Sequence, residues 1–97
     1  MEKLLEEFKK RMHISHSSED NSLEEILEES KLYIISKTGL DENDKRAKTL
    51  IFSRARYVYN DSLEFFEDNF LSEILGLSFE KYKGDDASET EVSTTKN

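Results

Sequence analysis

The sequence predicts an all-α fold, a small bundle of about four helices followed by an extended, partly disordered C-terminal arm. The 97 residues include no proline and only three glycines, and they are rich in the helix formers Glu, Lys and Leu. Apolar residues recur at three- and four-residue steps, which is the spacing of one face of a helix. We therefore expect a helical domain over residues 1–76 and an arm with a flexible acidic tail over residues 77–97.

Two helices are predicted in the first half of the chain. The first spans residues 2–12, and its apolar stripe consists of Leu4, Leu5, Phe8 and Met12. The second follows a Ser-rich connection, with Ser17 or Ser18 as its N-cap residue, and continues to about Lys37. Gly39 is expected to end it in the left-handed conformation.

Two further helices are predicted in the second half. The third is capped by Asp41 or Asn43 and ends at Asn60. Its inward-facing residues are Ala47, Leu50, Ile51, Ala55 and Val58. Phe52 is expected on its remaining surface. The fourth runs from about Ser62 to Gly76, with a main stripe of Leu63, Phe66, Phe70 and Ile74. Its additional apolar residues Phe65, Leu71 and Leu75 would form an oligomer contact if they are exposed.

The arm begins directly after Gly76. Residues 77–82 alternate loosely between apolar and polar side chains, which is typical of a short strand or an extended segment. Such a segment can add a strand to a partner's sheet, and its candidate partner-binding residues are Leu77, Phe79, Lys81 and Tyr82. From Gly84 onward the chain is small, polar and acidic, and we expect it to be disordered in the free protein.

The composition supplies little apolar material for a core. Charged residues make up 37% of the chain against 35% hydrophobic residues, and the net charge is −8. Because short chains bury a modest fraction of their surface, we expect a partner or self-association to add stability, or part of the chain to stay unfolded. The negative charge argues against tight binding to nucleic-acid phosphates. Without an apolar run of membrane length or a signal peptide, the sequence predicts a soluble protein of intracellular origin.

Few residues suggest catalysis or metal binding. The absence of cysteine excludes disulfides and thiolate chemistry. His13 and His16 stand near Glu19 and Asp20, but their spacing fits a metal ion only on a helix, and surface loop histidines are the favoured interpretation. The pairs Glu24/Glu28 and Glu25/Glu29 indicate an exposed acidic helix face. Because no P-loop, dinucleotide fingerprint or nucleophile elbow occurs, we expect no enzymatic activity, no metal and no cofactor.

The densest polar and aromatic cluster is RARYVYND in the third helix. Tyrosine and arginine are frequent interface hot spots because they bury area and still make polar contacts. The candidate subunit interface therefore contains Arg54, Arg56, Tyr57 and Tyr59, together with Phe65 of the fourth helix. The alternative is an internal role, in which one tyrosine packs in the core and one arginine pairs with a glutamate of a neighbouring helix. The sequence leaves both open.

Three segments carry a resemblance to a known family. They are MHISHSSEDNSLEEILEESKLYIISKTG, LIFSRARYVYND and LEFFEDNFLSEILGLSFEKY, in this order. Together with the short first helix, this pattern resembles the small head–tail connector (head completion) proteins of long-tailed bacteriophages over about residues 1–82. The compact link TGLDEND departs from the longer loop of many relatives.

The resemblance implies a structural protein of the virion, made in the cytoplasm of a bacterial host. Such proteins form a homo-oligomeric ring, usually of about twelve copies, beneath the portal protein at the head–tail junction. The ring extends the channel, through which the genome DNA passes without sequence-specific binding, and it docks the next neck or tail-joining protein. By position, the portal-binding arm of the family corresponds to residues 77–82 and beyond. No membrane is involved.

Two other functions remain open on the residues alone. A small acidic interaction module, such as a regulator that mimics nucleic acid, fits residues 13–40 (six acidic, two basic) and residues 62–76 (four acidic, no basic). A helical DNA-binding domain would use residues 41–61, which have five basic and four acidic side chains, but the overall negative charge disfavours it.

Overall fold

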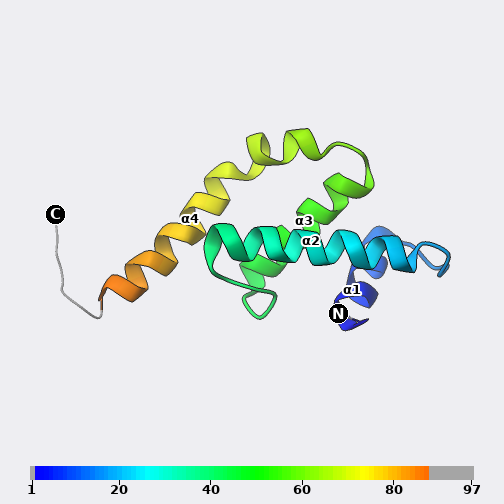
Figure 1. Ribbon diagram of the computed structural model, residues 1–97, viewed down its shortest axis with the longest axis horizontal. Coiled ribbons are helices and arrows are strands. Elements are labelled where there is room, and N and C mark those ends of the chain that lie inside the picture. Colours follow the sequence, from blue (N-terminus) through cyan, green and yellow to red (C-terminus); the bar gives the residue numbers. More distant parts are fainter. Residues whose placement is uncertain (1, 88–97) are drawn as a thin grey trace.

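The computed structural model describes residues 2–87, which contain helices and their connections and no strand (Figure 1). The four α-helices are α1 (Glu2–Met12), α2 (Asp20–Thr38), α3 (Lys45–Tyr59) and α4 (Phe66–Ala87), and a short 3-10 turn, η1 (Leu63–Phe65), precedes α4. The predicted all-α class with four helices is confirmed. None of the described helices is both long enough and apolar enough to cross a membrane. Most of the predicted acidic tail, residues 88–97, lies outside the described residues.

The molecule is elongated, measuring 52 × 26 × 17 Å along its principal axes. Its radius of gyration of 15.8 Å exceeds the roughly 13 Å typical of a compact domain of about 100 residues. Figure 1 shows the reason, because the second half of α4 continues past the C-terminal end of α2 and away from the other helices. In an elongated molecule, fewer residues can pack into a single core.

The core lies where α2 packs against α1, α3 and α4. One face of α2 is buried at three- and four-residue steps, and it consists of Leu23, Leu27, Ser30, Ile34 and Thr38. The predicted stripe of α1 is buried through Leu4, Leu5 and Phe8. The other helices contribute Ala47, Leu50, Ile51, Phe52 and Ala55 from α3, and Phe66, Ile74 and Leu77 from α4.

Phe52 is a correction to the predicted outer surface of α3, because its side chain is only 4% exposed. Its ring lies 5.8 Å from that of Phe8, centroid to centroid, and the Arg11 guanidinium lies 4.8 Å from its centroid. The buried face of α3 is therefore wider than contact with α2 alone would make it, because α1 covers a further side of the helix.

The two ends of α2 follow different rules. Gly39 ends the helix as predicted, with φ 76° and its N–H donating to the Ile35 carbonyl at 2.8 Å. The predicted N-cap residues of α2, Ser17 or Ser18, are wrong. Glu19 occupies the N-cap position without a side-chain hydrogen bond to the helix, so neither Ser17 nor Ser18 caps it.

Helix α3 is capped by Asp44, whose carboxylate accepts from the backbone N–H groups of Arg46 and Ala47. The predicted caps, Asp41 and Asn43, lie in the preceding turn, where Asp41 Oδ1 accepts from the Asn43 N–H at 2.9 Å. Asp44 binds two free N–H groups of the first helical turn at once, which explains why the helix starts after it.

Helix α4 corrects two predictions. It does not stop at Gly76, and residues 77–82 are helical rather than a strand or an extended arm. A glycine inside a helix costs about 1 kcal/mol relative to alanine, whereas burying one leucine side chain contributes about 1.5–3 kcal/mol. Leu77 is 6% exposed and continues the buried face begun by Phe66 and Ile74, so its packing outweighs the glycine.

Candidate interaction site

The predicted interface cluster on α3 is partly built into the fold, and Arg54 illustrates this. Its Nη1 donates to Ser30 Oγ at 3.1 Å, and its guanidinium lies 4.7 Å from the centroid of the Tyr33 ring. Ser30 is fully buried, so this hydrogen bond supplies a partner for a hydroxyl that water does not reach. Arg54 thus ties α3 to α2.

Tyr57 also makes internal contacts. Its ring meets the rings of Phe66 and Phe70 edge-on, each at a centroid distance of 5.7 Å. Its hydroxyl accepts a hydrogen bond from Asn69 Nδ2 at 2.8 Å. The half-buried tyrosine therefore joins α3 to the start of α4, as the internal alternative expected for one tyrosine of the cluster.

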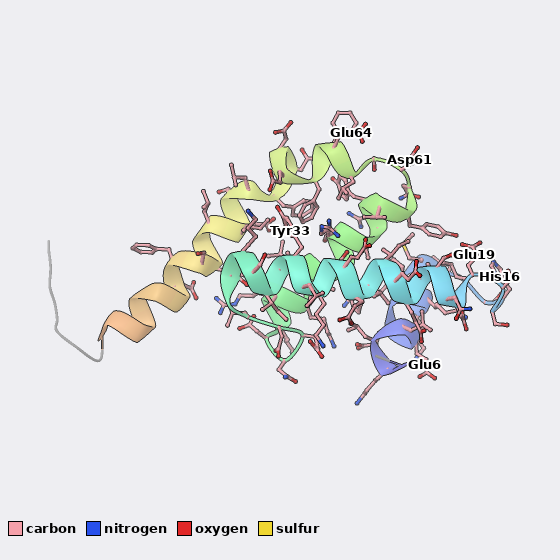
Figure 2. The ribbon with its side chains drawn as sticks, viewed as in Figure 1. Glu6, His16, Glu19, Tyr33, Asp61 and Glu64 are labelled. Carbon is pink, nitrogen blue, oxygen red and sulfur yellow. The ribbon has the colours of Figure 1, made fainter. Side chains whose placement is uncertain are left out.

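Tyr33 forms the matching contact from α2, where it lies beneath the start of α4 (Figure 2). Its ring packs edge-on against Phe66 at 6.2 Å, and its hydroxyl donates to the Glu67 carboxylate. Burial, and then this hydrogen bond, raise the pKa of Tyr33 to about 12. The neutral phenol is therefore the form that the fold stabilises.

We expect the stability of the fold to decrease between about pH 10 and pH 12 through Tyr33, because an unperturbed tyrosine titrates near pH 10 and Tyr33 at about 12. In this window the unfolded chain has lost a proton that the folded chain keeps, so unfolding becomes more favourable as the pH rises. The Tyr33→Phe variant should show a shallower decrease in chemical-denaturation experiments across the alkaline range. An unchanged slope would contradict the assignment.

The remaining members of the predicted interface are more accessible. Arg56 is exposed, with its guanidinium 5.7 Å from the Tyr57 ring centroid, and Phe65 is 54% exposed. Tyr59 is half-buried. The pKa of its hydroxyl is raised mainly by burial and, to a smaller extent, by the nearby Glu19 carboxylate. Arg56 and Phe65 are thus the members most available to a partner, and the interface itself stays a prediction.

The predicted arm residues differ in the same way. Leu77 belongs to the core, whereas Phe79 is 62% exposed on the part of α4 that extends from the bundle. The side chains of Lys81 and Tyr82 lie outside the described part of the structure. A partner that approaches α4 therefore meets Phe79 and not Leu77.

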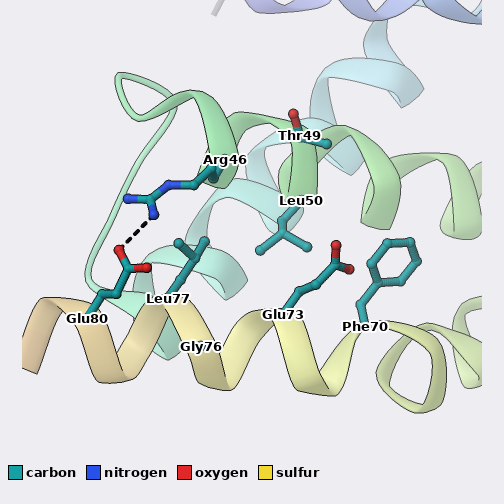
Figure 3. Close-up of a pocket in the computed structure, with 8 residues that line it drawn as sticks. All are labelled: Arg46, Thr49, Leu50, Phe70, Glu73, Gly76, Leu77 and Glu80. Carbon is teal, nitrogen blue, oxygen red and sulfur yellow. Dashed lines mark hydrogen bonds and ion pairs between the residues drawn. The ribbon is translucent and has the colours of Figure 1, made fainter.

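A groove between α3 and α4 was not anticipated from the sequence (Figure 3). This α3–α4 groove has a volume of about 340 Å³ and is lined by Arg46, Thr49, Leu50, Phe70, Glu73, Gly76, Leu77 and Glu80. At one end Arg46 Nη1 donates to Glu80 Oε1 at 2.7 Å. The groove exists because α4 continues through Gly76, and a helix ending there would have no Leu77 or Glu80 wall.

A second surface lies on another side of α4. Leu71 and Leu75 are 48% and 57% exposed, and we call this pair the α4 outer stripe. The excess of apolar residues in this helix was the sequence signal for it. Large apolar side chains that neighbour one another on a surface often mark a contact with another molecule.

The histidine and carboxylate group in the first connection lies at the opposite end of the molecule from α4 (Figure 2). His16 Nδ1 is 2.9 Å from Ser18 Oγ, and His16 Nε2 is 3.8 Å from a Glu19 oxygen. Among the described residues, no three His, Cys, Asp or Glu side chains are grouped to hold a metal ion.

Compared with protein families, curated proteins and solved structures, the chain matches none of them. Its surfaces are therefore the structural basis for assigning a role.

Proposed function

We propose that this chain is a virion structural protein that forms a ring beneath the phage portal, extends the DNA channel and docks the next neck or tail component. The observation that carries the proposal is the uncovered apolar surface of η1 and α4, where Phe65, Leu71 and Leu75 are each about half exposed. Only 35% of the residues are hydrophobic, and neighbouring copies in a ring would cover these exposed apolar side chains. The resemblance of the sequence to head–tail connector proteins supplies the specific setting.

The charge distribution suits a channel component. Glu25, Glu28 and Glu29 are exposed along α2, and among the described side chains no ion pair involves them. A surface of this kind repels DNA phosphates, which allows DNA to pass without adhering. The same acidic row favours the second candidate function, a small module that occupies a nucleic-acid site on another protein.

The test is to locate the protein in purified infectious particles. We expect mass spectrometry to detect it in multiple copies per particle and antibody labelling in the electron microscope to place it at the head–tail junction. Particles assembled without the gene should contain packaged heads that fail to join tails. Absence of the protein from infectious particles would overturn the proposal, and salt-sensitive capture of a DNA-binding protein would then favour the acidic module.

A further inference from the structure

The two apolar surfaces of α4 lie on different sides of the same helix. Phe70, Leu77 and the α3 residue Leu50 form the apolar part of the α3–α4 groove. An α-helix turns about 100° per residue, so Leu71 and Leu75 are directed away from the α4 side chains that line the groove. One molecule cannot place its own α4 outer stripe in its own groove, but a second copy can.

The groove is open at Gly76. A Cβ atom added there would meet no other atom within 4 Å, so the surface above this glycine is free. The Thr49 side chain forms the opposite rim, on α3, and is exposed. There is therefore space beside the backbone of α4 at Gly76, across the groove from Thr49, for an aliphatic side chain of another molecule.

One pair of charges on the two surfaces is complementary. Helix α3 has five basic residues and no acidic one, but Arg46, Lys48 and Arg54 already bond to Glu80, Glu7 and Ser30, which leaves Lys45 and Arg56. Residues 62–76 have four acidic residues and no basic one, but Glu73 lines the groove itself and Glu67 accepts from Tyr33, which leaves Glu64 and Asp68. Asp68 lies one helical turn before Leu71, and Lys45 lies one turn before Thr49. Among the described side chains, neither Asp68 nor Lys45 belongs to an ion pair.

We propose that the α4 outer stripe of one copy packs into the α3–α4 groove of a second copy, with Asp68 of the first copy near Lys45 of the second. The two surfaces differ, so each copy uses its stripe on one neighbour and its groove on another. Repetition of such a head-to-tail contact generates a closed ring or a filament rather than a symmetric dimer. The inference rests on the proposed connector ring for its biological role and names the contact that builds it.

The absence of cysteine from the chain allows a direct test by cross-linking. Thr49→Cys places a thiol at the groove rim, and Ser72→Cys places one beside the stripe without altering Leu71 or Leu75. The double variant, treated with a short bis-maleimide at high protein concentration, should give a ladder of dimers, trimers and larger species. The control pair Glu25→Cys with Ser72→Cys, which uses the exposed face of α2, should give no ladder.

Two changes that leave the core intact should remove the ladder of the Thr49→Cys, Ser72→Cys protein. Leu75→Glu places a charge in the stripe, and Gly76→Leu fills the groove where there is space for a side chain. Circular dichroism should show unchanged helix content for both. A ladder that persists in both would overturn the proposal.

Other outcomes also decide the matter. Dimers from Ser72→Cys alone, in the yield of the double variant, would indicate a symmetric contact between two α4 helices and overturn the head-to-tail arrangement. No cross-linked product from any variant would overturn the contact. If the protein gives a ladder but is absent from virions, the contact is retained and the connector role is overturned. If the protein is present in virions but gives no ladder, the connector role is retained and the contact is overturned.

Discussion

Replacing Phe66 by alanine should lower the free energy of unfolding by about 3–5 kcal/mol. Phe66 is 1% exposed, and its ring lies 6.2 Å from that of Tyr33, 5.7 Å from that of Tyr57 and 4.9 Å from that of Phe70, centroid to centroid. The side chain therefore fills the junction of α2, α3 and α4, and its removal leaves a cavity that all three helices border. Small domains have a total stability of about 5–15 kcal/mol, so this variant should be close to unfolding.

The matched control is the preceding residue. Phe65→Ala makes the same chemical change at a side chain that is 54% exposed, and we expect a change within about 0.5 kcal/mol. Urea unfolding followed by circular dichroism measures both. Equal losses in the two variants would show that the ring cluster around Phe66 does not hold the helices together.

The second large effect is expected at the centre of α2. Leu27→Ala should cost about 2–5 kcal/mol, because Leu27 is fully buried in the helix that packs against α1, α3 and α4. Loss of its side chain removes contacts and leaves a void that the surrounding helices close only in part.

Leu32→Ala is the control on the same helix, since Leu32 is 56% exposed on the outer side of α2. Thermal unfolding should show a large decrease in midpoint for Leu27→Ala and little change for Leu32→Ala. A larger loss at Leu32 than at Leu27 in the isolated protein would contradict the burial of α2 described above.

Local patterns were sufficient to predict the number of helices and much of the core. The stripe of α1 and the glycine at the end of α2 depend on neighbours within a few residues, and both were predicted correctly. The N-caps of α2 and α3 were not, because each connection contains several Ser, Asp or Asn residues that are possible caps and the sequence does not distinguish among them. Phe52 was misplaced because the sequence gives no indication that α1 packs against that side of α3.

The site was less predictable than the fold. The extra apolar residues of α4 were recognised, but the groove beside them depends on long-range packing of Leu77 against α3. A glycine and a loose alternation of polar and apolar residues favoured an extended segment locally, and burial reversed that preference. The contacts of Arg54 with Ser30 and Tyr33 likewise join residues that are distant in sequence.

The continuity of α4 limits how far the chain can reach. As a helix, residues 77–87 span about 16 Å, whereas the same residues in extended form would span about 36 Å. A partner that binds this segment must come close to the bundle itself. The buried side chains of Ile74 and Leu77 anchor the base of this segment in the core. The segment is therefore a helical extension of the core and not an extended connection.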